Sequence, residues 1–344
     1  LGIIKASFAS ALDFRYLCTM VGGKQMEWIL APMDGVTDFP YRNAWMEVFG
    51  PYAKMHRSVA PFVTLVPGSK VRRSHLRDLW PENNRMEVEP QILGNEAEWF
   101  LPMAEALHDM GYVSVNWNLG CPVRQVARKQ RGSGLLPYPG KIADFLDKVL
   151  PSSPLALSVK VRTGYFSAQE IFPVMEVLNA YPLQYVAVHP RIGLQLYKGM
   201  ADWDMLDRIL PLMEHVCVYS GDIDSVAKAD AFCARFPSVR EIMIGRGMIA
   251  DPFLPCRLSG YVFVSTEERF LFKLFVEALL RHYWRSGLPE KAVLQRQKMF
   301  WSKFSGDFVP TGAFGRIKSL DSVKEYVQVL DSLFEDKIEH GFLA

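Results

Sequence analysis

The sequence predicts an α/β fold, a (β/α)₈ TIM barrel followed by a C-terminal all-helical domain. From residue 27 onward, short apolar runs alternate with helical patterns, and the runs predict strands over 27–31, 52–60, 87–92, 112–117, 155–161, 184–188, 216–219 and 240–244. Eight strands in alternation with helices is the count of this barrel. A doubly wound open sheet is the alternative, but the loop at 30–35 lacks its GxGxxG, whereas glycine-rich turns follow the seventh and eighth strands.

We divide the chain into three parts. Residues 1–26 lack the basic-then-apolar order of a secretory signal, and we interpret them as an N-terminal extension or a start placed too early. Residues 27–259 would form the barrel and residues 260–344 the helical domain. In the latter, basic residues recur at four-residue spacing along one helical stripe, interrupted by Glu277: Arg269, Lys273, Arg281 and Arg285. Such a stripe is either a solvated face or a surface for a polyanion.

The composition is that of an ordinary globular protein. With a net charge of only +2, any basic binding surface must be local. Five cysteines without a CxxC pair suit a reducing compartment, so we expect a cytoplasmic protein: Cys18, Cys121, Cys217, Cys233 and Cys256. No apolar run approaches the roughly 20 residues of a membrane span, and we expect neither membrane attachment nor a metal centre.

A cysteine lies directly after the fourth predicted strand, in the motif Asn118-Leu119-Gly120-Cys121-Pro122. The C-terminal ends of the strands are where barrel enzymes carry their chemistry. A thiol there can donate a proton or act as a nucleophile, although a free cysteine is also a common small buried hydrophobe.

Other polar residues fall at the same end of successive predicted strands. Gln91, Lys160 and His189 end the third, fifth and sixth strands. The turns Ser220-Gly221-Asp222 and Gly245-Arg246-Gly247 follow the seventh and eighth strands, the usual phosphate site of such barrels. Each residue alone is more often structural, but their convergence describes a site.

These motifs, in this order, resemble those of the tRNA-dihydrouridine synthases, a family of flavin-dependent, FMN-binding barrels with a helical RNA-binding domain. The resemblance covers about residues 27–305. It rests on the runs at 30–38, 90–94, 118–122, 159–164, 189–191, 197–199, 202–203 and 245–247.

The resemblance implies a cofactor site and a reaction. Pro32, Met33 and Asp34 would line FMN, Gln91 and Lys160 would contact its ring, His189 would border it, and the phosphate would be held by Ser220, Gly221, Asp222, Gly245 and Arg246. NADPH would reduce FMN, which would pass hydride to C6 of a uridine in tRNA, and Cys121 would protonate C5. Two residues depart from the family pattern: Asn116 stands where an acidic residue is usual, and Ser220 where an asparagine is usual. Because Cys121 and Lys160 are present, we still expect activity.

A uridine inside folded RNA must leave its stack to reach a buried flavin. We expect phosphate contacts from local basic residues, and a monomer acting on tRNA. The candidates beside the thiol and in the helical domain are Arg124, Arg128, Lys129, Arg131, Arg281, Arg285 and Lys298.

Two alternative functions remain. A flavin-dependent barrel oxidoreductase of a small pyrimidine-like molecule would explain Cys121 and the phosphate turns, but it leaves the basic helical region unexplained. A catalytically inactive RNA-binding relative would lack a flavin.

Overall fold

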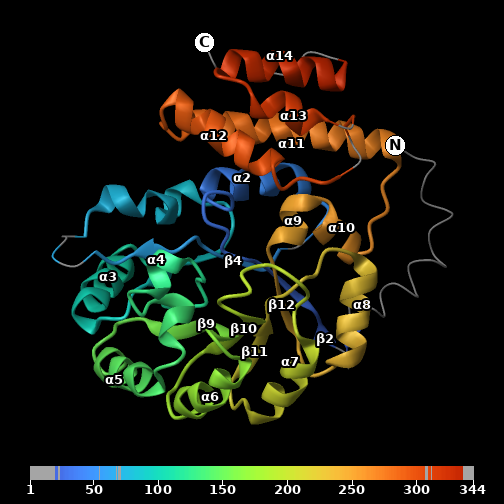
Figure 1. Ribbon diagram of the computed structural model, residues 1–344. Helices are drawn as coiled ribbons and strands as arrows, with labels where there is room; N and C mark the ends of the chain where they lie inside the picture. The colour runs from blue at the N-terminus through green and yellow to red at the C-terminus, as the bar shows by residue number, and fades with distance from the viewer. Residues whose placement is uncertain are drawn as a thin grey trace.

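The computed structural model describes residues 20–21, 24–53, 55–66, 68, 71–306, 309–310 and 312–335. A parallel sheet forms its centre, with helices around it (Figure 1). The strands of this sheet are β3 (Glu27–Leu30), β4 (Arg57–Val59), β5 (Val63–Thr64), β6 (Val88–Glu89), β7 (Gln91–Leu93), β8 (Ser114–Leu119), β9 (Ala156–Gly164), β10 (Tyr185–Ile192), β11 (Val216–Tyr219) and β12 (Glu241–Ile244).

The sheet closes into the predicted eight-stranded barrel. Its order is β5-β7-β8-β9-β10-β11-β12-β3-β4-β6. The β6 and β7 strands are two halves of one strand interrupted by Pro90, so the two ends of this order meet. Proline has no N–H for the ladder, but its carbonyl still accepts a hydrogen bond from the Asn116 amide at 2.8 Å.

The eight predicted strands are all present, with different ends. The second strand was predicted over 52–60 but pairs only over Arg57–Val59, because α2 and the turn after it extend to Tyr52. Around the barrel lie α2 (Phe39–Phe49), η1 (Arg73–Leu79), η2 (Pro81–Asn83), α3 (Ala97–Asp109), α4 (Arg124–Ala127), η3 (Gly132–Leu135), α5 (Pro139–Val149), η4 (Ala168–Glu170), α6 (Ile171–Asn179), α7 (Trp203–Ile209), η5 (Leu210–Leu212), α8 (Val226–Arg235), α9 (Arg246–Ala250) and α10 (Leu254–Leu258).

The barrel interior has an apolar part and a polar part. The apolar cluster includes Ile29, Val59, Val218 and Met243, from β3, β4, β11 and β12. On β6 to β9, in contrast, buried polar side chains recur at every second position: Glu89, Gln91, Asn116, Asn118 and Ser158. Alternation with period two places these side chains on the inner face.

The C-terminal region is helical, as predicted, and packs on α2 (Figure 1). It contains α11 (Ser265–Arg285), α12 (Glu290–Trp301), α13 (Ala313–Lys318) and α14 (Val323–Phe334). Phe275 of α11 packs edge-on to Tyr41 of α2, with 5.8 Å between ring centroids, and its ring lies 5.6 Å from that of Phe300 in α12. The predicted boundary at 259/260 falls between α10 and α11, but both sides contribute to one continuous core.

The predicted N-terminal extension lies mostly outside the described residues. Within it, β1 (Met20–Val21) and β2 (Lys24–Gln25) pair as a short antiparallel ribbon that is separate from the barrel. In the described part of the chain, no helix combines the length and apolar character needed to cross a membrane.

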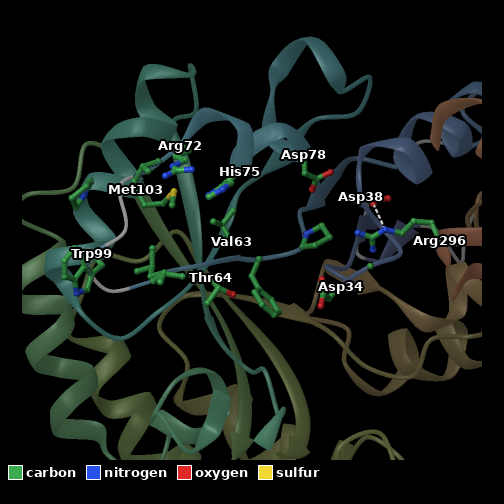
Figure 2. A pocket seen from close by; sticks show the side chains of 18 residues that line it. Asp34, Asp38, Val63, Thr64, Arg72, His75, Asp78, Trp99, Met103 and Arg296 are labelled. Carbon is green, nitrogen blue, oxygen red and sulfur yellow. Dashed lines mark ion pairs between the residues drawn. The ribbon is translucent and has the colours of Figure 1, made fainter. Parts of the chain in front are cut away.

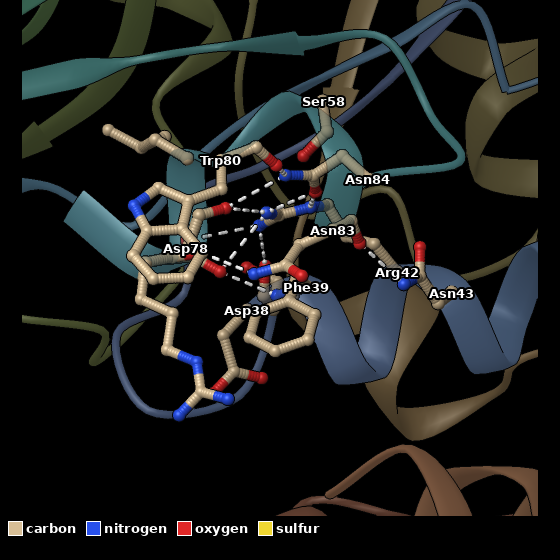
Figure 3. Close-up of polar contacts among 12 residues, drawn as sticks. Asp38, Phe39, Arg42, Asn43, Ser58, Asp78, Trp80, Asn83 and Asn84 are labelled. Atoms are coloured by element: carbon tan, nitrogen blue, oxygen red, sulfur yellow. Dashed lines mark hydrogen bonds and ion pairs between the residues drawn. The ribbon is translucent and has the colours of Figure 1, made fainter. Parts of the chain in front are cut away.

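A buried arginine anchors the start of α2 (Figure 3). Arg42 donates to the carbonyls of Thr37 and Asp78 at 2.7 and 2.8 Å and to Asn84 Oδ1 at 2.7 Å. Asp78 in turn accepts the amide of Phe39 at 2.6 Å. The loop after β3 is therefore held against the segment that contains η1 and η2.

The same loop is also held by the helical region. The Tyr283 hydroxyl donates to Asp38, and Arg296 lies 3.7 Å from the same carboxylate. Burial and the neighbouring Asp78 raise the pKa of Asp38 to about 7. The helical region is thus in contact with the loop that begins with the predicted cofactor residues.

Candidate active site

Cys121 lies in a tight turn at the C-terminal end of β8. The Asn118 side-chain oxygen accepts the backbone N–H groups of Gly120 and Cys121, at 3.0 and 2.8 Å. The cysteine is 7% exposed, and burial together with the charge of Asp34 raises the pKa of its thiol. The thiol therefore carries its proton at neutral pH and is suited to act as an acid rather than as a thiolate nucleophile.

Gly132 packs against this turn. It has φ +56°, and a methyl group on it would lie 2.6 Å from the Cys121 carbonyl oxygen and 2.9 Å from Cys121 Cβ. Both the backbone conformation and the contact require glycine at this position.

Gly132→Ala will displace Cys121 and lower the rate of product formation by roughly tenfold or more, because small displacements of a reacting group are costly. Gly140→Ala is the matched control, since among the described residues no atom beyond its own helical turn lies within 4 Å of the added methyl group. The rates of the two variants should be compared at equal folded fraction. Equal rates in both would mean that the turn tolerates the displacement.

Cations gather beside the thiol at the same end of the barrel. Lys160 and Arg162 come from β9, His189 and Arg191 from β10, and Arg246 from the start of α9. Burial, with a smaller effect of Arg162, lowers the pKa of Lys160 to about 7. Burial and these four cations hold the pKa of His189 well below its usual value, so its imidazole is neutral.

Asp222 holds two of these arginines. It pairs with Arg191 and with Arg246, and it accepts the amide of Ala201 at 2.9 Å. Although burial acts in the other direction, these hydrogen bonds keep the pKa of Asp222 below its usual value. A carboxylate repels phosphate, so Asp222 positions the arginines at the predicted phosphate site.

A cavity of about 390 Å³ lies over the turns that follow β11 and β12. Its lining consists of Arg191, Gly199, Met200, Gly221, Asp222, Ile223, Asp224, Lys228, Arg246, Gly247, Ala250 and Ser305. A methyl group on Gly221 or Gly247 would lie 1.9 Å from the Tyr219 hydroxyl or 2.1 Å from the Ile223 carbonyl oxygen. Within the part of the chain that the structure describes, the buried Nε of Arg191 has no hydrogen-bond partner. The donors and the excess of positive charge fit an anionic ligand.

The loop after β3 completes the site. Met33 and Ala31 lie against Gly245, with the Met33 sulfur 3.1 Å from where a Cβ would stand, so the first and eighth strands meet here. Asp34 is exposed and lines a second cavity of about 730 Å³, between this loop, η1, α3 and α12. In this cavity Asp38 and Arg296 lie at one end and Trp99 at the other (Figure 2).

The structure also contains residues that the sequence analysis did not assign to the site. Arg162 donates to the carbonyls of Gly120, Ile192 and Leu196 at 3.0, 2.9 and 2.7 Å, and so joins the cysteine turn to the loop after β10. Tyr197 in that loop lies beneath the guanidinium groups of Arg162 and Arg246. A second basic residue, two positions after Lys160 and on the same strand face, was the signal available in the sequence.

The predicted RNA-binding residues near the thiol fall into two groups. Arg124, Arg128 and Lys129 are exposed on α4 and the turn after it. Arg131 is buried and donates to the Leu65 carbonyl at 2.9 Å and to Asn95 at 3.0 Å. Arg124, Arg128 and Lys129 are therefore exposed at the end of the barrel that carries Cys121, whereas the Arg131 guanidinium is held by hydrogen bonds within the protein.

The basic stripe of α11 is not a single solvated face. Arg269 donates to the Leu333 carbonyl at 2.8 Å, Glu277 is buried, and Arg281 pairs with Glu47 of α2. In α12, Lys298 donates to the Leu320 carbonyl. Arg285 is exposed. RNA contacts by Arg281, Arg285 and Lys298 stay predictions.

Comparison with known proteins identifies relatives. A family model described as dihydrouridine synthase matches residues 29–286. A "Probable tRNA-dihydrouridine synthase" of Rickettsia bellii (strain RML369-C) is 27% identical over 241 residues, 70% of this chain and 72% of that protein. A "tRNA-dihydrouridine synthase B" of Pseudomonas putida is 29% identical over 237 residues, 68% of each. The fold is similar to that of histamine dehydrogenase from Rhizobium sp. 4-9, with a TM-score of 0.50, 11% identity, and coverage of 78% of this chain and 50% of that one.

Proposed function

This chain belongs to the dihydrouridine synthase family, so its activity is the reduction of uridine to 5,6-dihydrouridine in tRNA, and we propose that it uses FMN and NADPH with Cys121 as the proton donor. The observation that carries the proposal is a buried thiol, with its pKa raised, at the same end of the barrel as the four cations that act on His189. The thiol suits proton transfer, and the cations suit an anionic cofactor.

The residues at the barrel mouth fit FMN. Arg191 and Arg246 would hold the phosphate over the turns after β11 and β12, with Ser220, Gly221 and Gly245 lining it. The buried Gln91 amide is bonded to Asn116 and Asn118, so its second N–H and second lone pair are what it would present to the ring. Lys160 has no hydrogen-bond or ion-pair partner within the described residues, so its ammonium is available to a ligand. Pro32, Met33, Asp34 and His189 would border the cofactor.

When bound, reduced FMN supplies the hydride for C6 of uridine. The second hydrogen, at C5, must arrive as a proton, and the Cys121 thiol carries one in a buried position. The Asn118 and Arg162 hydrogen bonds fix the turn on which this thiol lies. Lys160, protonated when an anion approaches, would stabilise negative charge on the flavin ring.

The basic residues beside Cys121 favour a tRNA substrate over a free pyrimidine. Exposed Arg124, Arg128 and Lys129 lie within eight residues of Cys121 in sequence, where a small substrate has no need of them. The test is to map dihydrouridine in RNA from a strain with this gene deleted. Loss of dihydrouridine at defined tRNA positions supports the proposal, and an unchanged map contradicts it.

Arg246→Ala will weaken FMN binding by about 1–3 kcal/mol, the range of a hydrogen bond between charged groups. The measurement is flavin fluorescence during titration of the FMN-free protein. Arg235→Ala is the control, because Arg235 also pairs with two carboxylates, Asp204 and Asp207, but does not line the cavity. FMN affinity equal to that of the control would remove Arg246 from the phosphate site.

Replacing Arg124, Arg128 and Lys129 with alanine will weaken tRNA binding and lower its salt slope by about 1 for each lost phosphate contact. The control replaces Lys148, Arg208 and Arg235, which lie in the last turns of α5, α7 and α8. Those turns face the N-terminal end of the barrel, away from the thiol. Equal salt slopes in the two triple variants would contradict an RNA contact beside Cys121.

A further inference from the structure

A chain of hydrogen bonds runs from the cysteine turn into the barrel interior. The backbone N–H groups of Gly120 and Cys121 donate to Asn118 Oδ1. Asn118 Nδ2 donates to Gln91 Oε1 at 2.8 Å, and Gln91 Nε2 donates to Asn116 Oδ1 at 2.7 Å. Every side chain in this series is buried.

The chain continues toward the opposite end of the barrel and ends on a carboxylate. Asn116 Nδ2 donates to Ser158 Oγ at 2.8 Å and to the Tyr185 hydroxyl at 3.3 Å. Both hydroxyls donate to Glu89, Ser158 at 2.6 Å. Arg57 pairs with Glu89 at 2.8 Å and, through its other terminal nitrogen, with Glu241 at 2.8 Å.

The chemistry of its two ends fixes the direction of this chain. Backbone N–H groups can only donate, so Asn118 must present its oxygen to the turn and its NH₂ group to Gln91. Burial raises the pKa of Glu89, but Arg57 and two hydroxyl groups donate to this carboxyl and stabilise its charged form. As a carboxylate it can only accept, so Ser158 and Tyr185 give it their protons and accept from Asn116. Each amide between the ends has one orientation that satisfies both neighbours. A reversed amide would place two acceptors or two donors in contact.

We infer that Glu89 is a positioning residue, which from the far end of the barrel fixes the orientation of Gln91 and supports the turn that carries Cys121. The inference rests on the proposed roles of Gln91 at the flavin and of Cys121 as the acid. It explains why a carboxylate lies inside the barrel, where it would otherwise be costly to bury. Glu89 itself is separated from the barrel mouth by Ser158, Asn116 and Gln91.

The direction can be reversed by two isosteric substitutions. Asn118→Asp keeps the acceptor for the turn but places an oxygen against Gln91 Oε1. If the side-chain amides of Gln91 and Asn116 rotate by half a turn, Asn116 Oδ1 faces the Ser158 hydroxyl and needs its proton. Ser158 already donates that proton to Glu89. Glu89→Gln releases that proton and supplies an NH₂ group to Ser158 Oγ. The double variant can therefore satisfy Ser158, Asn116, Gln91 and the carboxylate at position 118 with the hydrogen-bond chain running the other way, and only the 3.3 Å hydrogen bond from Asn116 to the Tyr185 hydroxyl is lost.

The test compares full-length, cofactor-free variants by thermal unfolding. We expect Asn118→Asp and Glu89→Gln each to lower the unfolding temperature, and the double variant to unfold above Asn118→Asp alone. The control is Asn118→Asp with Glu241→Gln, which removes the other carboxylate on Arg57 without contacting Ser158 and should not recover stability. A double variant no more stable than Asn118→Asp, or equal recovery by the control, would overturn the inference.

A second readout reports on Gln91. In the double variant Gln91 is turned over, so FMN should bind roughly tenfold more weakly than to the wild-type chain although stability has recovered. Wild-type FMN affinity in the stabilised double variant would show that Gln91 is not oriented by the chain, and it would overturn the inference. If the wild-type protein itself binds no FMN, the proposed function fails. The unfolding comparison still decides the direction of the hydrogen-bond chain.

Discussion

Replacing Cys121 with alanine will lower the rate of dihydrouridine formation by about 10²- to 10⁴-fold, the usual contribution of a positioned general acid. FMN binding and the oxidation of NADPH should remain, because neither needs the thiol proton. The measurement is single-turnover formation of dihydrouridine in tRNA, with flavin reduction by NADPH followed separately. The variant thus separates the proton step from the delivery of electrons.

Cys217→Ala is the control for this prediction. Cys217 is also buried, with a pKa raised to about 12, but it lies on β11 and packs within the core. We expect this variant to retain the rate of the wild-type chain at equal folded fraction. Full activity of Cys121→Ala would return Cys121 to the class of buried structural thiols.

FMN affinity will fall by up to about 100-fold between pH 7 and pH 9, and Lys160→Met will remove most of this dependence. The free Lys160 amine has a pKa of about 7, lowered chiefly by burial. An anionic ligand favours the ammonium form, so binding above pH 7 takes up a proton and becomes weaker by up to tenfold for each pH unit. Below pH 7 the amine is already protonated, and this contribution is constant.

The measurement is titration of FMN-free protein at several pH values, with fluorescence detection. Lys141→Met is the control, because Lys141 is exposed and contacts only Gln130 and Tyr138 among the described residues. It should keep the pH dependence of the wild-type chain. An affinity that is independent of pH in the wild-type chain, or equally dependent in Lys160→Met, would contradict a role for this ammonium at the cofactor.

The barrel could be predicted from the sequence because its strands follow a simple physical rule. Short apolar runs between helical patterns mark buried parallel strands, and each run predicted here contributes a strand. Residues at the ends of those runs share one edge of the barrel, so Cys121, Lys160 and His189 could be assigned to one site from the sequence alone. Pro90 shows where the rule needs correction, since a missing N–H divides one predicted strand into β6 and β7.

The hydrogen-bond partners of the site could not be predicted in the same way. Asn116 and Glu89 are far apart in sequence from Ser158 and Tyr185, and only closure of the barrel brings these side chains together. Likewise, the sequence predicted Asp222 at the phosphate site, but its ion pairs with Arg191 and Arg246 there could not be foreseen. Such partners depend on the register between neighbouring strands, which the apolar pattern alone does not specify.

The helical stripe illustrates a further limit. Four-residue spacing correctly places basic residues along α11, but spacing does not tell which neighbour covers that face. Packing of α11 on α2 gives Arg281 a partner in Glu47, whereas Arg285, one turn later, is exposed. The spacing of charged residues therefore identified a face of the helix, whereas tertiary packing decides which residues of that face are paired and which are exposed.

The central claim is that this chain delivers a hydride and the Cys121 proton to a uridine in tRNA. Its most direct test mixes the NADPH-reduced, FMN-loaded protein with unmodified tRNA in the absence of oxygen. The proposed function predicts that flavin absorbance returns while one dihydrouridine forms for each flavin reoxidised, and that free uridine has no effect. Reoxidation by free uridine, or no reoxidation by tRNA, would contradict it.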